Sequence, residues 1–477
     1  MVSPKGPGAS GADEVKPGST GDARSNGAAP TNGSVVNDGN GANGKRPGIR
    51  LVESGGVVAT SAREVPDEQR RLPILQTVSP RMREPSVAGS LGSQRQAPKP
   101  EYVPAPVHER PFGAEIAEWL EVRRTTPLLE LGARADALRQ QKHPDGVVSY
   151  IVDRNINYSN VCVTDCRFCA FYRRPKDDEA YVLSYEEIGA KIDETKALGG
   201  VQILMQGGHN PYLPIDWYTE LLRYIKEHHP IHVHGFSASE VEMISKVSKL
   251  PIDEVLLQLR QAGLDSMPGA GAEILVDAVR DFIAPKKIDS SRWIEIHEAA
   301  HEVGLLTTAT MMYGVGEAWE DRLEHMLKLR AAQERSLKRG AGHFTAFITW
   351  SFQPSHTEME SWDLQLGTGV DYLTTTALGR LVLDNFDNVQ VSYVTQGPKM
   401  AQIALRFGAN DFGSLMIEEN VVSATGIDFI MPEKEIVRLI EDAGFTPRRR
   451  YQDYTLANES DDGCPCCAQR VAASVEG

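Results

Sequence analysis

Eight short apolar runs rich in β-branched residues alternate along the chain with longer stretches of helical periodicity, beginning near residue 148. A strand followed by a helix, repeated in this order, predicts a parallel sheet with right-handed crossovers. Eight repeats over roughly 270 residues match the size of a (β/α)8 barrel, so we expect an α/β fold of the TIM-barrel type. A doubly wound open sheet is the alternative, because periodicity does not show whether a sheet closes. The predicted strands are 148–156, 201–206, 231–237, 263–269, 306–314, 344–352, 388–395 and 411–417.

Polar and glycine-rich residues follow the predicted strands. Barrel enzymes build their active sites at the C-terminal ends of the strands, so these residues are expected to gather around one cavity. Glycines end strands in many proteins without such a site, but their recurrence with polar side chains favours an enzyme over a simple binding module. They are Gln206, Gly207 and Gly208 after the second strand, Ser239 and Glu240 after the third, Glu273 after the fourth, Tyr313 at the end of the fifth, and Trp350 and Gln353 at the sixth.

The two ends of the chain differ in composition from its middle. No aromatic residue precedes Tyr102, and Gly, Ser, Pro, Asn and Ala dominate the first hundred positions. Such a segment buries too little apolar surface to offset the entropy lost on ordering. We therefore expect a disordered low-complexity extension over residues 1–105, the barrel over 106–450, and a flexible cysteine-containing tail over 451–477.

Composition and charge exclude several classes of partner. The net charge is −15, which argues against a nucleic acid or an anionic membrane as a partner held by bulk electrostatics. The chain has no apolar run of about 18 residues and no apolar core of a signal peptide. We expect a cytoplasmic protein without a nucleic-acid or membrane partner.

Three of the six cysteines, Cys162, Cys166 and Cys169, lie in the short sequence NVCVTDCRFCAFYRR with Cx3Cx2C spacing. Six cysteines in 477 residues are too few for a disulfide scaffold. The three closely spaced cysteines are therefore interpreted first as metal ligands. Structural zinc takes four ligands, whereas a [4Fe–4S] cluster held by three cysteines keeps one iron open to a small molecule. A zinc site completed by a histidine or a tail cysteine is the alternative. The tail cysteines are Cys464, Cys466 and Cys467.

The Cx3Cx2C spacing after the first predicted strand resembles the motif of radical S-adenosylmethionine (SAM) enzymes, in which an aromatic residue such as Phe168 often precedes the last cysteine. Over about residues 115–445 the chain resembles the branch of that superfamily that makes menaquinone precursors. The resemblance is carried by DRNINYSNVCVTDCRFCAFYR, QILMQGGHNPYLPIDWY, HVHGFSASEV, AGLDSMPGAGAEIL, TTATMMYGVGE and FTAFITWSFQPSHT. Within the branch, TTATMMYG and FITWSFQP resemble the futalosine cyclases; aminofutalosine synthases and deazaflavin-forming enzymes are the alternatives. Ala270 and Val315 depart from the usual pattern.

The resemblance implies an oxidoreductase with a [4Fe–4S] cluster and SAM as cofactors. It implies that a 5′-deoxyadenosyl radical takes the 4′ hydrogen of the ribose in dehypoxanthine futalosine, after which the substrate closes a ring. The expected partners are that nucleoside substrate and an electron donor such as flavodoxin or ferredoxin.

The resemblance also implies roles for individual residues. Cys162, Cys166 and Cys169 are the expected metal ligands. Glu273 is the expected catalytic residue, which binds the substrate or accepts the final proton, although it also fits the start of a helix. Ser239 and Glu240 also fit a helix cap. The expected cofactor-binding residues are Phe168, Gly207, Gly208, Ser239 and Glu240, and the expected substrate-binding residues are Gln206, Tyr313, Trp350 and Gln353.

Overall fold

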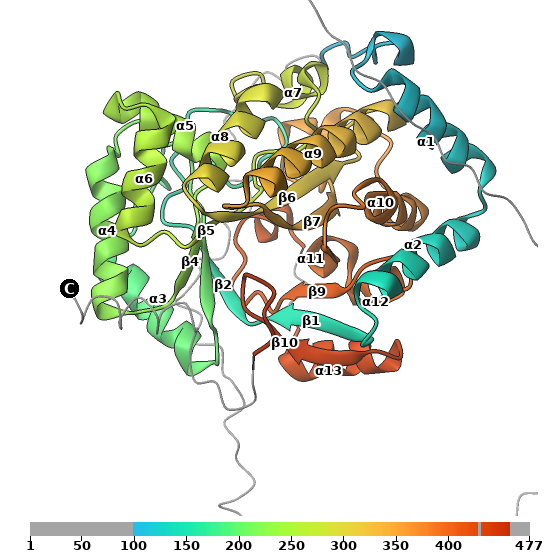
Figure 1. Ribbon diagram of the computed structural model, residues 1–477. Helices are drawn as coiled ribbons and strands as arrows, with labels where there is room; N and C mark the ends of the chain where they lie inside the picture. The colour runs from blue at the N-terminus through green and yellow to red at the C-terminus, as the bar shows by residue number, and fades with distance from the viewer. Residues whose placement is uncertain (1–98, 428–430, 458–477) are drawn as a thin grey trace, which may run out of the picture. The chain divides into compact units, whose positions relative to one another are not determined.

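Every strand pair in the described part of the chain is parallel, as the alternation of strands and helices predicts. The computed structural model describes residues 99–427 and 431–457 (Figure 1). The strands are β1 (Val147–Ile151), β2 (Asp153–Ile156), β3 (Gln202–Met205), β4 (His232–Gly235), β5 (Ser266–Met267), β6 (Leu306–Tyr313), β7 (Phe344–Ser351), β8 (Asn388–Gln390), β9 (Asp411–Ser414) and β10 (Thr446–Arg449).

The sheet closes into a barrel through its first strand. Only Val152 separates β1 from β2, so the two are halves of one interrupted strand. β1 pairs with β9, while β2 pairs with β3. The amide of Ile417, just after β9, continues the first of these pairings by donating to the carbonyl of Asp153 at 3.0 Å. The β1/β2 strand therefore joins the two ends of the row from β3 to β9. This arrangement confirms the (β/α)8 barrel, and β10 is an additional strand paired with β1.

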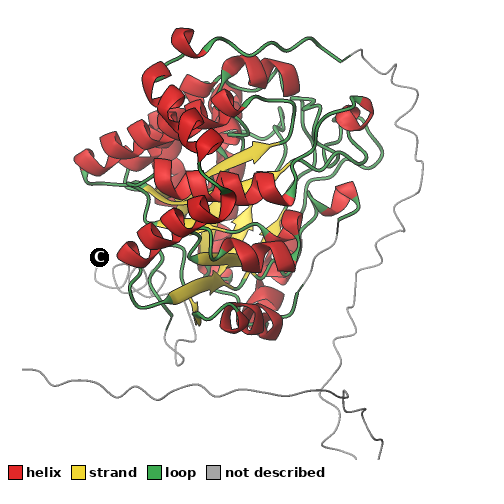
Figure 2. Ribbon diagram, turned by 90° about the vertical axis from the view of Figure 1, so that its right-hand side faces the viewer, coloured by secondary structure: helices red, strands yellow, loops and turns green. Residues whose placement is uncertain are grey.

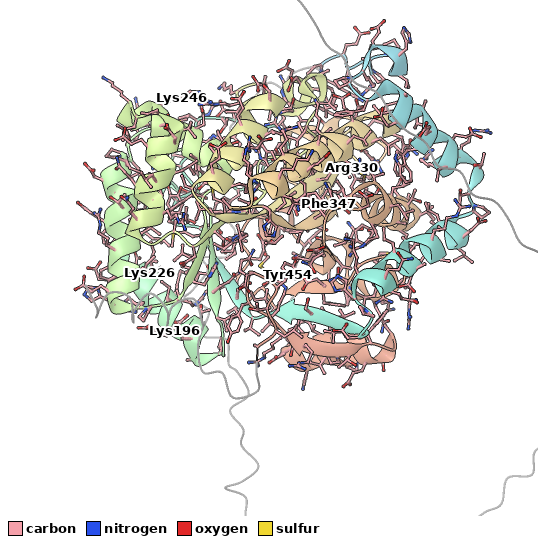
Figure 3. All side chains as sticks on the ribbon, in the orientation of Figure 1. Lys196, Lys226, Lys246, Arg330, Phe347 and Tyr454 are labelled. Atoms are coloured by element: carbon pink, nitrogen blue, oxygen red, sulfur yellow. The ribbon has the colours of Figure 1, made fainter. Side chains whose placement is uncertain are left out.

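Helices surround the strands on the outside (Figure 2). Alternate residues of a strand face opposite sides, and β7 shows the consequence: Phe347, labelled in Figure 3, packs against Gly379 of a covering helix, whereas Ile348 and Trp350 face the interior cavity. No described helix combines the length and apolarity needed to span a bilayer. The helices are α1 (Gly113–Thr125), α2 (Leu128–Lys142), α3 (Tyr185–Ala197), α4 (Ile215–His228), α5 (Ala238–Ser248), α6 (Ile252–Ala262), α7 (Asp277–Ile283), α8 (Ser290–Glu302), α9 (Trp319–Arg339), α10 (Gly369–Val382), α11 (Tyr393–Gln396), α12 (Pro398–Ala404) and α13 (Glu433–Asp442).

The residues after β10 form the floor of the barrel. Arg450 is buried, and its Nε and Nη2 donate to the carboxylate of Asp411 at 2.6 and 2.9 Å. The guanidinium also lies 4.0 Å from the ring centroid of Tyr454, which is labelled in Figure 3. Gln452 is buried beside His234 of β4, with 3.4 Å between the two side-chain nitrogens. Arg450 and Gln452 therefore belong to the barrel interior.

Both ends of the packed chain reach beyond the predicted barrel boundaries of 106 and 450. At the N-terminal side the hydroxyl of Tyr102 donates to Asp321 of α9 at 2.5 Å, and its ring lies 5.6 Å from that of Phe282. At the other side the chain stays packed through Gln452. Residues 1–98 of the predicted extension and the three tail cysteines lie outside the described residues.

Candidate active site

A cavity of about 380 Å³ lies inside the barrel and extends to the loops that follow its strands. Three thiols, several amides and a few aromatic rings share its wall, a mixture typical of cofactor and substrate sites. The cavity brings together most of the site residues that the sequence predicts. These are Cys162, Cys166, Phe168, Cys169, Gln206, Gly207, Gly208, Glu240, Glu273 and Trp350.

The three cysteines lie on the loop after β2. Cys162 and Cys166 are buried and Cys169 is half-buried, and the amide of Cys169 donates to the carbonyl of Cys166 at 3.0 Å. Burial raises the pKa of the Cys166 and Cys169 thiols. Buried thiolates therefore need a strong positive partner in order to persist. Thiolates are soft ligands that suit iron–sulfur clusters, so the donor set on this cavity wall fits such a cluster.

Among the described residues, no three His, Cys, Asp or Glu side chains are arranged around a single metal ion. A [4Fe–4S] cluster differs from such a site, because each thiolate binds a different iron of the cluster. Its ligands surround a group of atoms rather than converge on one point. Three thiols on one loop are therefore compatible with such a cluster.

Two glycines after β3 allow the neighbouring loop to approach the cysteines closely. A Cβ atom at Gly207 would overlap the ring of Tyr158, and one at Gly208 would overlap the carbonyl oxygen of Val161. The amide of Gly208 donates to the carbonyl of Ser159 at 2.9 Å, which ties this loop to the cysteine loop. Glycine is required at both positions because the Tyr158 ring and the Val161 backbone occupy the space that a side chain would need.

We expect Gly208→Ala to displace the backbone next to Cys162 and to weaken cluster binding. Overpacking of this kind costs about 1–3 kcal/mol of unfolding free energy. Denaturant unfolding of the apoprotein and iron content after reconstitution measure the two effects. Gly235→Ala, whose added Cβ would lie 3.3 Å from the backbone oxygen of Met205, a tight contact without the overlap found at Gly208, is the milder comparison in which both should change less. Full iron binding by Gly208→Ala would show that the cysteine loop tolerates the displacement.

Glu240 fastens the glycine loop to helix α5. Its Oε1 accepts from the hydroxyl of Tyr158 at 2.8 Å and from the amide of Gly207 at 2.9 Å. Its Oε2 accepts from the amide and the hydroxyl of Ser237 at 2.8 and 2.7 Å, which forms a capping box at the start of α5. Four hydrogen-bond donors occupy the two carboxylate oxygens of Glu240. Its role as a helix cap, the alternative considered from the sequence, therefore applies. We propose that Glu240 positions Gly207 rather than binding the cofactor directly.

Glu273 differs from Glu240 because one of its carboxylate oxygens accepts no hydrogen bond. Its Oε1 accepts from Nζ of Lys287 at 2.6 Å, while its Oε2 is buried without a hydrogen bond, 3.8 Å from a guanidinium nitrogen of Arg280. The backbone φ of Glu273 is +42°. This is the left-handed region, which residues other than glycine adopt at a conformational cost of about 1–3 kcal/mol. A strained residue with a free buried oxygen on the cavity wall is suited to accept a proton from a ligand.

Three predicted site residues lie outside the cavity lining. Thr308 and Thr310 of β6 face the cavity, and Tyr313 lies on the opposite side of the same strand. Its ring therefore faces the surrounding helices, where it contacts Arg322. Gln353 donates to the carbonyl of Ser351 at 3.0 Å instead of pointing inward. Ser239 is buried behind Gly271, and its hydroxyl has no hydrogen-bond partner.

Other cavity residues escaped prediction. Thr308 and Thr310 line the wall, and strand alternation in LTTATMMY was a signal that could have identified them. Arg450 and Gln452 reach the cavity from the floor, and Lys287 reaches it from the loop between α7 and α8. No pattern in the sequence places these three residues at the cavity, since none follows a predicted barrel strand.

Comparisons with known proteins agree with this architecture. Residues 156–329 match the Radical SAM superfamily, and residues 341–462 match the CofH/MqnC C-terminal region. The chain is 46% identical over 334 residues to cyclic dehypoxanthine futalosine synthase of Halalkalibacterium halodurans, covering 70% of this chain and 88% of that protein. It is 41% identical to 5-amino-6-(D-ribitylamino)uracil--L-tyrosine 4-hydroxyphenyl transferase of Methanococcoides burtonii, covering 62% and 82%. The fold resembles that of methylornithine synthase (PylB), with a TM-score of 0.55 at 18% identity over 70% of this chain and 94% of that one.

Proposed function

Since the chain belongs to the radical SAM superfamily, whose enzymes use a [4Fe–4S] cluster and S-adenosylmethionine, we propose that it is a cyclic dehypoxanthine futalosine synthase. The observation that carries the proposal is the 46% identity to that enzyme across 88% of its length. In the proposed reaction one nucleoside, dehypoxanthine futalosine, loses the hydrogen atom at its ribose 4′ carbon to a 5′-deoxyadenosyl radical, which becomes 5′-deoxyadenosine. The resulting carbon radical closes a ring onto the substrate's own aromatic acid, and loss of one proton to a base and one electron to a one-electron acceptor restores the aromatic ring. The product has two hydrogens fewer than the substrate.

The cavity offers separate places for the cofactors and the substrate. We propose that Cys162, Cys166 and Cys169 hold the cluster on one wall, where the bound cluster and SAM supply a 5′-deoxyadenosyl radical. Trp350 on β7 provides an aromatic surface for the substrate ring. Stacking on such a surface orients a planar acid and keeps water from it.

Glu273 is the proposed acceptor of the proton that leaves the substrate after ring closure. A general base has to lie on the cavity wall with a free oxygen, and its Oε2 is buried there without a hydrogen bond. Lys287 and Arg280 flank the carboxylate, so its orientation is fixed before a substrate arrives. The electron that enters the cluster is proposed to come from a separate carrier such as flavodoxin or ferredoxin.

Isotope transfer tests the proposed reaction. Anaerobic, reconstituted protein is incubated with SAM, a reductant and dehypoxanthine futalosine carrying deuterium at the ribose 4′ carbon. Deuterium should appear in 5′-deoxyadenosine, in step with a product that has lost two hydrogen atoms, one of them the deuterium. The absence of deuterium from 5′-deoxyadenosine would contradict the assignment. A product that retains the adenosyl group would indicate an aminofutalosine synthase instead.

The transferase similarity defines the second candidate function, because its 41% identity is close to that of the cyclase. A parallel incubation with tyrosine and 5-amino-6-(D-ribitylamino)uracil distinguishes the two. Turnover of that pair, without turnover of the nucleoside, would move the assignment to the transferase.

A further inference from the structure

Lys287 lines the same cavity as the three cysteines, although it does not follow a barrel strand. It lies between α7 and α8, yet its side chain is only 9% exposed and lines the cavity. Its Nζ lies 5.4 Å from the ring centroid of Phe168, the residue just before Cys169. The adjacent Lys286 is 58% exposed and pairs with Asp165 at 2.6 Å. The two neighbouring lysines thus differ in environment: Lys287 lines the cavity that contains the three thiols, whereas Lys286 is exposed and does not.

Lys287 and Arg280 are two cations with largely buried side chains on either side of Glu273. The Nζ of Lys287 donates to Oε1 of Glu273 at 2.6 Å. Glu273 is the carboxylate that forms an ion pair with Lys287, and it also lies 3.8 Å from the guanidinium of Arg280. Arg280 is held by the carbonyl oxygens of Ala272 and Ile288. Asp277 and Asp289 also act on the charge of Arg280. Lys287 is therefore the cation of this group that lines the cavity with the cysteines.

A cluster held by three thiolates is negatively charged, and reduction adds a further negative charge. Net charge near a cluster is one of the factors that set its reduction potential. In a buried site a cation stabilises the more negative, reduced state, because the low dielectric leaves the attraction poorly screened. We infer that Lys287, oriented by Glu273, raises the reduction potential of the cluster and so eases electron entry. This inference rests on the proposed ligation by the three cysteines and is independent of which substrate is used.

The test compares Lys287→Met with Lys286→Met in the full-length protein. Iron content is measured first, and the midpoint potential is then determined without SAM by redox titration monitored by electron paramagnetic resonance. In Lys287→Met the ratio of reduced to oxidised cluster at a fixed potential should fall about tenfold, which is about 59 mV for a one-electron couple. Lys286→Met should titrate like the original protein, and Lys287→Arg should largely restore the original potential.

A second variant keeps the inference testable if Lys287→Met binds no iron. Glu273→Gln removes the negative partner and keeps the side-chain shape, so the potential should rise. If Lys287→Met binds iron and its midpoint potential is unchanged, the inference is overturned. If Lys287→Met binds no iron, an unchanged midpoint potential in Glu273→Gln overturns it instead. Weaker SAM binding at an unchanged potential would make Lys287 a ligand contact instead. If the original protein binds no iron, the cysteine assignment fails, and the inference fails with it.

Discussion

Replacing Cys162, Cys166 or Cys169 singly with serine should abolish the broad visible absorption of the iron–sulfur cluster and all product formation. The original protein should bind about four irons, with each of the three cysteines holding a different one. Within residues 99–427 and 431–457 there is no other cysteine that could replace a missing ligand. Iron analysis and visible spectra after anaerobic reconstitution measure the loss.

The second set of cysteines provides the matched control. The combined variant Cys464→Ser, Cys466→Ser, Cys467→Ser leaves the cavity thiols intact and should keep its iron and its absorption. Iron loss in this variant would place a ligand in the tail. Full cluster content in all three single variants of the first set would refute the ligation proposed here.

Glu273→Gln should lower the rate of cyclic product formation by about 10²–10⁴-fold, the usual contribution of a general base. Glutamine keeps the size of the side chain and can still accept a hydrogen bond from Lys287, but it cannot take a proton at neutral pH. Hydrogen removal precedes the proton transfer, so 5′-deoxyadenosine should continue to form. The ratio of 5′-deoxyadenosine to product, read by mass spectrometry, should therefore rise.

Glu273→Asp separates the charge from the reach of this side chain. Aspartate tolerates the left-handed backbone found at this position and keeps a carboxylate, so part of the product yield should return. A Glu273→Gln enzyme with the original product rate would limit Glu273 to holding Lys287.

The sequence predicted those features of the fold that depend on local periodicity or on spacing between nearby residues. The apolar runs identified the barrel strands, and the cysteine spacing identified the loop after the first of them. Closure required the structure, because the pairing of β1 with β9 joins Ser149 to Asp411, far apart along the chain. Tyr102 packs on the barrel just outside the predicted boundary, and a single packed side chain of this kind leaves no periodic signal in the sequence.

Within the site, the sequence predicted strand ends better than side-chain directions. Tyr313 follows an apolar run just as Trp350 does, but strand alternation turns Tyr313 toward Arg322 and Trp350 toward the cavity. Lys287 was missed because its position depends on how the loop between α7 and α8 packs over the cysteine loop. Its contacts with Phe168 and Glu273 are tertiary and have no fixed spacing in sequence.

The strand pairs formed by β1 limit how early the barrel can close while the chain is being synthesised. β1 lies between β9 and β10, and Val147 pairs with Thr446, so this strand gains its neighbours only when almost the whole chain has left the ribosome. Contacts this distant in sequence form slowly, because a long loop has to close first. The cysteine loop follows β2, the other half of the same interrupted strand. We therefore expect iron to be loaded after translation ends, into a barrel already closed from below by Arg450 and Asp411.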